Sequence, residues 1–205
     1  MVRPFAFLLA CLLAAVGSDA GSATAIGTVT RLQGACQGAM NGTAEDLSLG
    51  ATVLADEAIS TGPAARLEIT LSDRTVVTLG EEATLTLDEF VFRPAGASQL
   101  HLVVAGAFRF VSGKLSAGAT RQASVTTPFA TIGIRGTDFW GGPIDGRFGV
   151  VVLEGRVAVS HRGRTAVLYR PHSGVDLDTL ASMPGPVTTW ATAKIDRAVA
   201  TVSFR

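Results

Sequence analysis

The chain has few of the side chains that build most catalytic and metal sites. Of its 205 residues, three are histidine, two are cysteine and one is tyrosine. No histidine has another His, a Cys or a carboxylate at the spacing of a metal site. The sequence also has no Gly-x-Ser-x-Gly elbow, no phosphate-binding loop and no Cys–His nucleophile pair. It therefore predicts no enzyme, no cofactor and no bound metal.

Charge is low and balanced, with 17 Lys and Arg residues against 17 Asp and Glu residues. A nucleic-acid-binding domain normally carries a basic stripe, so we expect no nucleic-acid partner. The 23 glycines and the 47% of hydrophobic residues are typical of a folded, turn-rich β protein and not of a disordered chain. The length suits one domain with a sizeable core.

The one long apolar run lies at the N-terminus. Arg3 precedes an apolar segment over residues 5–16, and Ser18-Asp19-Ala20 offers small residues to a signal peptidase. We predict a signal peptide over residues 1–20 and an exported, periplasmic protein. The run is shorter than the roughly 20 residues that cross a bilayer, and no later stretch is longer, so we expect no stable membrane span.

The two cysteines bear on anchoring and dimerisation. Cys11 follows Leu8-Leu9-Ala10, which partly resembles a lipobox, but the apolar run continues beyond it, so we favour a cleaved leader over a lipid anchor. Cys36 would then have no partner for an internal disulfide. We favour a buried, inert thiol. The glycines around Cys36 indicate a turn, however, and keep a disulfide-linked homodimer open as the alternative.

Short alternating segments recur about every ten residues, separated by turn residues. Leu67, Ile69 and Leu71 share one strand face, and Phe108 and Phe110 share another. We predict three hairpins, formed by residues 66–71 with 75–79, 100–104 with 107–111, and 148–154 with 156–160. The pattern predicts an all-β fold of many short antiparallel strands, arranged as a two-layer sandwich or a solenoid.

The most specific pattern is Val-Thr-Thr-Pro-Phe-Ala-Thr-Ile-Gly-Ile-Arg-Gly-Thr-Asp-Phe, at residues 125–139. It resembles the T-P-x-A-x-(V/I)-x-(V/I)-R-G-T-x-F signature of FecR domains. Residues 61–75 are similar to a second FecR pattern, with Arg74 where glycine is usual, and the V-x-x-G-x-V-x-V run of the third hairpin is FecR-like too. The resemblance implies a FecR-like all-β domain over residues 21–183, followed by a tail, 184–205, that forms a helix or an edge strand.

The signature and the residue after it supply the candidate interaction residues, which are Arg135, Gly136, Thr137, Phe139 and Trp140. The guanidinium of Arg135 could anchor a partner through two hydrogen bonds. It could instead pair with Asp138, Asp145 or Glu154 and hold the loop that Gly136 permits. We favour this structural role, which predicts that Arg135→Ala lowers thermal stability.

FecR sensors of iron signalling usually join a cytoplasmic anti-sigma segment, a membrane helix and a periplasmic domain, and this chain is similar to the periplasmic domain only. We therefore expect a non-catalytic periplasmic interaction module that binds another envelope protein in signalling or assembly, for example by adding a strand at a sheet edge. The alternative is a module that binds cell-wall or surface polysaccharide, with Trp140 and Trp190 stacking on sugars. We favour a core position for both tryptophans.

Overall fold

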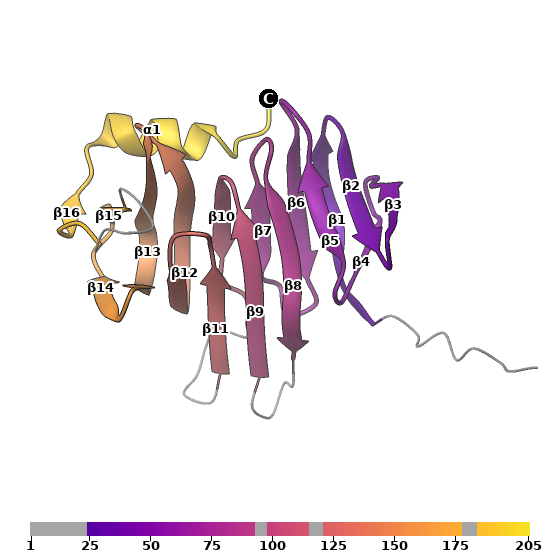
Figure 1. Ribbon diagram of the computed structural model, residues 1–205, viewed down its shortest axis with the longest axis horizontal. Helices are drawn as coiled ribbons and strands as arrows, with labels where there is room; N and C mark the ends of the chain where they lie inside the picture. The colour runs from indigo at the N-terminus through magenta and orange to yellow at the C-terminus, as the bar shows by residue number, and fades with distance from the viewer. Residues whose placement is uncertain (1–23, 93–97, 115–120, 178–183) are drawn as a thin grey trace, which may run out of the picture.

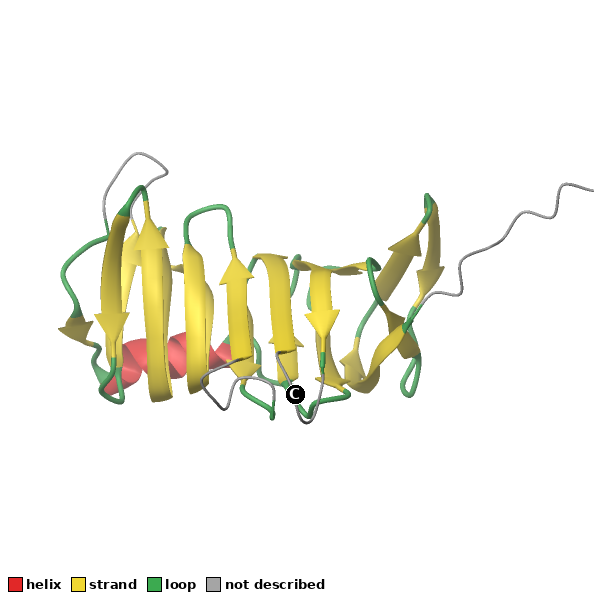
Figure 2. Cartoon of the chain, turned by 90° about the horizontal axis from the view of Figure 1, so that it is seen from below, coloured by secondary structure: helices red, strands yellow, loops and turns green. Residues whose placement is uncertain are grey.

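The computed structural model describes residues 24–92, 98–114, 121–177 and 184–205, so the predicted signal peptide and Cys11 lie outside the described residues. The described chain forms sixteen β-strands and one α-helix, which confirms the all-β prediction. All sixteen strands belong to a single sheet that curls over on itself (Figure 1). The molecule is elongated, and its strands stand side by side along the long axis (Figure 2).

The sheet consists of two arms, which we define by the order of strand pairing. The first arm runs β3-β2-β5-β8-β9-β11, with bounds β2 (Cys36–Met40), β3 (Thr43–Asp46), β5 (Ala58–Thr61), β8 (Thr84–Val91), β9 (Ser98–Ala105) and β11 (Arg121–Thr126). The second arm runs β4-β1-β6-β7-β10, with bounds β1 (Ala25–Gln33), β4 (Thr52–Leu54), β6 (Arg66–Leu71), β7 (Val76–Leu79) and β10 (Phe108–Val111).

Two long strands, β12 (Thr131–Ile144) and β13 (Arg147–His161), join the arms as an antiparallel pair. The first half of β12 pairs with β11 in the first arm, and its second half pairs with β10 in the second arm. β13 likewise pairs with β14 (Arg164–Leu168) at one end and with β15 (Ser173–Leu177) at the other. The short β16 (Thr188–Thr189) follows β15.

The chain crosses repeatedly from one arm to the other, as in a solenoid. β1 lies in the second arm, β2 and β3 in the first, β4 in the second and β5 in the first. The sequence predicts a two-layer sandwich or a solenoid, and this alternation within one curled sheet agrees with the solenoid-like alternative. The sheet is mixed and not wholly antiparallel, because β9 and β11 run parallel.

One of the three predicted hairpins is present, and two are wrong. β6 and β7 form the first as expected. β9 and β10 lie in different arms, because Gly106 (φ +94°) turns the chain across the domain, so tightly that a Cβ there would lie 2.8 Å from Ala83. Residues 148–154 and 156–160 are parts of one strand, β13, because Gly155 sits at an irregularity in the β12–β13 register and not in a turn.

The two arms enclose one hydrophobic core. Leu67 and Ile69 from β6 are fully buried in it, as the alternation predicts. Phe108 and Phe110 are also fully buried, and both contact Phe139, at ring-centroid distances of 5.7 and 5.6 Å. Burial of a side chain of this size contributes about 2 kcal/mol, so this trio stabilises the junction of β10 with β12.

Helix α1 (Thr192–Ala200) lies across the β12–β13 pair (Figure 1). Its buried residues Ile195 and Ala198 pack with Trp140 and Val151 of the sheet in a second, smaller core. The indole N–H of Trp140 donates a hydrogen bond to Thr201 Oγ1 at 3.0 Å. Residues 184–205 thus form both a helix and a two-residue strand, β16, which pairs with β15, whereas residues 201–205 form no strand.

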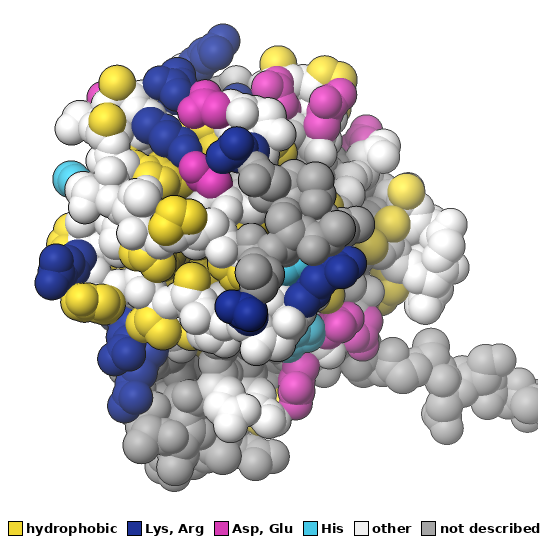
Figure 3. Space-filling model, turned by 60° about the vertical axis from the view of Figure 1, so that its left-hand side comes forward, with side chains coloured by type: hydrophobic (Ala, Val, Ile, Leu, Met, Phe, Trp, Pro, Cys, Tyr) yellow, Lys and Arg dark blue, Asp and Glu magenta, His cyan; other side chains and the backbone are white. Residues whose placement is uncertain are grey.

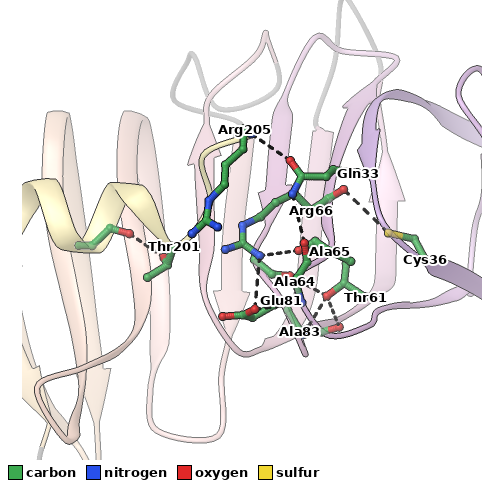
Figure 4. Close-up of polar contacts among 12 residues, drawn as sticks. Gln33, Cys36, Thr61, Ala64, Ala65, Arg66, Glu81, Ala83, Thr201 and Arg205 are labelled. Atoms are coloured by element: carbon green, nitrogen blue, oxygen red, sulfur yellow. Dashed lines mark hydrogen bonds and ion pairs between the residues drawn. The ribbon is translucent and has the colours of Figure 1, made fainter.

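The Thr61-Gly62 pattern fixes a corner between the arms (Figure 4). Thr61 Oγ1 donates to the carbonyl of Gly80 at 2.6 Å and accepts the backbone N–H of Ala83 at 2.9 Å. The C-terminus is held nearby, because the N–H of Arg205 donates to Gln33 Oε1 at 2.9 Å. This part of the FecR-like pattern is architectural.

The Asp73-Arg74-Thr75 turn is architectural as well. The buried carboxylate of Asp73 accepts the N–H of Thr75 at 2.9 Å and its hydroxyl at 2.8 Å. Between them, Arg74 has φ +73°, in the left-handed region that favours glycine. The glycine that is usual at this position of the pattern would adopt this φ without the steric strain that Arg74 incurs.

Candidate functional site

An open groove of about 520 Å³ lies on the first arm, where β11, β12, β13 and β14 stand side by side. Short side chains form its floor, because Ser124, Gly133 and Ala158 are direct partners in one row across three strands. Val167 extends the row onto β14. Residues on either side of this row, such as Ile134 and Val157, face the core, so the row itself faces outward.

Two arginines line the groove beside this floor. Arg135 of β12 and Arg156 of β13 are direct cross-strand partners, and both are exposed. Like charges directly opposite each other destabilise a strand pair. Neither guanidinium has a hydrogen bond or an ion pair with any described residue. A carboxylate or phosphate placed between them would remove this repulsion and accept the paired hydrogen bonds that guanidinium groups provide.

The carboxylates that the sequence suggested as partners of Arg135 do not contact it. Asp138 forms a two-point ion pair with Arg109, at 2.9 and 2.6 Å, and these hydrogen bonds raise the pKa of Arg109. Asp145 pairs with Arg197 at 2.9 Å. Glu154 is exposed and makes no ion pair with a described residue. Within the described part of the chain, Arg135 therefore makes no ion pair or hydrogen bond that would support the structural role we favoured.

Thr137 and two glycines set the position of the arginine pair. Thr137 Oγ1 donates to the carbonyl of Arg156 at 2.7 Å and accepts its N–H at 3.3 Å. Gly136 (φ +57°) and Gly155 (φ +83°) face each other so closely that a Cβ on Gly155 would overlap the carbonyl oxygen of Gly136. The register of β12 and β13 shifts here, and this irregularity, which we call the crossover bulge, lies directly beside Arg135 and Arg156.

The remaining two signature candidates are interior residues. Phe139 is fully buried in the main core, and Trp140 is fully buried beneath α1. Trp190 is 4% exposed and packs beside Trp140, with ring centroids 6.3 Å apart. This confirms the core position of both tryptophans. It also removes the stacking surface on which the polysaccharide alternative depended.

Comparison with known proteins agrees with this geometry. The family model described as FecR protein matches residues 57–158, which contain the groove floor, the arginine pair and the crossover bulge. The chain belongs to the FecR family. No curated protein matches it.

Solved structures resemble this FecR chain in fold. Two crystal structures of a proposed anti-sigma factor from Parabacteroides distasonis, at 1.65 and 2.50 Å resolution, each align with a TM-score of 0.55 and 18% identity. Each alignment covers 69% of this chain and 64% or 63% of that chain. The FecR chain thus spans less than two thirds of these neighbours, and the likeness concerns the fold.

A Ser124–His101–Asp88 row on the outer face of the FecR domain has the residue types of a hydrolase triad. Ser124 Oγ and His101 Nδ1 are 2.9 Å apart, and His101 Nε2 lies 3.8 Å from Asp88 Oδ2. Catalysis by such a row needs free N–H groups that stabilise an oxyanion. Ser124 lies in mid-strand with β9 on one side and β12 on the other, so its backbone belongs to the sheet. The row has the geometry of a surface hydrogen-bond network.

Cys36 does not lie in an exposed turn. It begins β2 and is 2% exposed, and its thiol points toward the carbonyl of Arg66 at 3.9 Å (Figure 4). Burial raises the pKa of the Cys36 thiol, which disfavours the thiolate that disulfide exchange requires. The buried position of Cys36 is therefore confirmed, its inertness stays a prediction, and a homodimer linked through Cys36 gains no support.

Sequence reasoning found Arg135 but missed Arg156, Ser124 and Gln122, the other polar residues of the groove. Arg156 could have been found if residues 148–160 had been interpreted as one strand, because the pairing of Gly133 with Ala158 places Arg156 opposite Arg135. Within the described ranges, no group of three or more His, Cys, Asp and Glu side chains could hold a metal ion. In the same ranges, the helix is too short and too polar to cross a bilayer.

Proposed function

We propose that this FecR-family protein is a non-catalytic periplasmic module that regulates signalling by binding an acidic segment of another envelope protein in the groove. The observation that carries the proposal is the exposed pair Arg135–Arg156, which stands unpartnered among the described residues beside a floor of short side chains. Its family membership supports a regulatory role, and the N-terminal leader supports export.

The groove suits an extended acidic peptide. Ser124, Gly133 and Ala158 leave room for a backbone to approach, while the arginines on one side supply two planar donors. A hydrogen bond to a charged group contributes about 1.5–3 kcal/mol. A segment with one carboxylate between Arg135 and Arg156 would therefore gain both affinity and register from these two residues.

Site-specific photo-crosslinking in intact cells tests this proposal. A photoreactive residue at Ala158, in the groove floor, should form one defined adduct with an envelope protein. The matched control is the same residue at Thr28, which is exposed on the second arm. Arg135→Glu with Arg156→Glu should abolish the Ala158 adduct, and Arg135→Lys with Arg156→Lys should weaken it, because lysine keeps the charge but loses the planar fork.

Two results would count against the groove. One is an adduct of equal yield from Ala158 and Thr28, and the other is an adduct that survives the double charge reversal. Export is tested separately by N-terminal sequencing of the protein from the periplasmic fraction, which should begin at Gly21. An N-terminus that retains Arg3 would contradict the cleaved leader.

A further inference from the structure

The charges of this chain are balanced in total but segregated along the sequence. Residues 32–65 contain four carboxylates, from Glu45, Asp46, Asp56 and Glu57, and no Lys, Arg or His. Residues 155–175 contain four arginines and no Asp or Glu; the arginines are Arg156, Arg162, Arg164 and Arg170. The fold carries these two segments to opposite ends of the long axis, with β2 and β3 at one end and β14 at the other (Figure 1).

Each of these ends presents an open strand edge. Among the described residues, β3 pairs only with β2 and β14 pairs only with β13, so one side of each strand has backbone N–H and C=O groups without a ladder partner. The two strands lie at opposite ends of one row of paired strands. This row is the first arm, from β3 to β11, followed by β12, β13 and β14. Open edges of this kind are templates for pairing with another chain.

The two edges carry opposite charge. On β3, Glu45 and Asp46 are exposed; among the described residues Asp46 has a partner, Gln37 at 3.0 Å, and Glu45 has none. At the other end, Arg162 and Arg164 are exposed and have no hydrogen bond or ion pair with a described residue. Figure 3 turns this end forward, with dark-blue Lys and Arg side chains along its left and centre and magenta carboxylates in its upper and right-hand parts.

Charged residues on a single edge commonly prevent aggregation. Here the signs differ, so repulsion opposes β3 with β3 and β14 with β14, while attraction favours β3 with β14. We propose that the protein assembles head to tail, with the acidic β3 edge of one copy pairing with the basic β14 edge of the next. The two strands are similar in length, at four and five residues. Such a contact joins two different surfaces, so it builds an open chain or a ring of several copies and does not close as a two-fold dimer.

Sedimentation velocity of the purified protein tests this inference. At low salt, the weight-average mass should rise with concentration beyond that of a dimer. It should fall toward the monomer as salt approaches 1 M, where the screening length shrinks to about 3 Å. A mass that stays at the monomer, or that stops at a dimer, at every concentration would overturn the proposal.

A charge exchange identifies the edges. Glu45→Lys with Asp46→Lys makes both edges basic, and Arg162→Glu with Arg164→Glu makes both acidic, so each double variant alone should remain monomeric. An equimolar mixture should assemble again, because each basic edge then meets an acidic one, and this rescue shows that both variants are folded. Glu89→Lys with Asp196→Lys is the matched control for Glu45→Lys with Asp46→Lys. It changes the net charge by the same amount, at exposed positions away from both edges, and should assemble like the wild type.

Two outcomes would refute edge pairing: assembly by either double variant alone, or a mixture that stays monomeric. The groove proposal is independent of these results, because Arg135 and Arg156 are unchanged in all of these variants. A protein that loses assembly but keeps the Ala158 adduct would separate the two functions.

Discussion

The crossover bulge makes a quantitative prediction at Gly155. An alanine there must adopt φ near +83°, which costs about 1–2 kcal/mol for an L-residue. Its Cβ would also overlap the carbonyl oxygen of Gly136 and lie 2.9 Å from the Cα of Thr137, and both are backbone atoms that cannot rotate away. A forced backbone shift of this kind typically costs a further 1–3 kcal/mol or so.

Against these costs, alanine reduces the conformational freedom of the unfolded chain, which returns about 0.4–1 kcal/mol. The net expectation for Gly155→Ala is a loss of about 1–5 kcal/mol in the free energy of unfolding. For a domain of this size, each kcal/mol lowers the melting temperature by about 2–4 °C. Thermal unfolding followed by circular dichroism should therefore show a decrease of about 2–20 °C.

Gly136→Ala is the matched control, because it lies in the same bulge on the facing strand. Gly136 has φ +57°, but nothing lies within 4 Å of an added Cβ. This variant incurs the conformational cost without the overlap and should lose only about 1 kcal/mol. If the two variants melt within 1 °C of each other, the close approach of Gly155 to Gly136 does not limit stability, and this reasoning is refuted.

Three further predictions follow from single residues. Arg74→Gly should raise the free energy of unfolding by up to about 1 kcal/mol in urea denaturation, because Arg74 has φ +73°; a clear loss would contradict this. Arg135→Ala should change stability by less than about 0.5 kcal/mol, contrary to our expectation from sequence, because the side chain is exposed and has no partner among the described residues; a large fall in melting temperature would restore the structural role. Cys36 should react with a thiol reagent only after denaturation, and rapid labelling of the native protein would show that the site opens.

Strand positions and core faces could be predicted from the sequence because they depend on local alternation. Leu67, Ile69, Phe108 and Phe110 are buried as their period of two requires. This information is contained within six residues of each strand. It does not depend on which neighbour the strand eventually pairs with.

The path of the chain after each glycine could not be predicted in the same way. A glycine marks where the backbone departs from a straight strand, but the direction it takes is set by distant contacts. At Gly106 the chain passes to the opposite arm, and Ala83, far earlier in the sequence, lies so close that a larger residue would not fit there. Gly155 continues a strand because Gly136 lies against it. Local turn preferences cannot distinguish these cases from a hairpin.

The candidate site shows the same limit. Arg135 stood out because it is the one basic residue within an otherwise largely apolar signature, but its counterpart Arg156 follows only from the register of β12 with β13. The wrong hairpin at residues 148–160 concealed that register. The pairing of Arg135 with Arg156 therefore depends on how β12 and β13 align, and it cannot be predicted from either segment alone.

A substitution at Thr137 tests whether the signature residues that stabilise the fold also position the arginine pair for binding. Its hydroxyl both donates to and accepts from the backbone of Arg156, at 2.7 and 3.3 Å, while being 4% exposed. Thr137→Val keeps the shape but leaves the part-buried carbonyl and N–H of Arg156 without these contacts, which costs about 1 kcal/mol. We expect Thr137→Val to lower both the melting temperature and the yield of the Ala158 adduct, because the held position of Arg156 is lost. Arg135→Ala should lower the adduct alone. If Thr137→Val melts lower but keeps the full adduct, the bulge does not position the arginine pair, and the groove binds by some other feature.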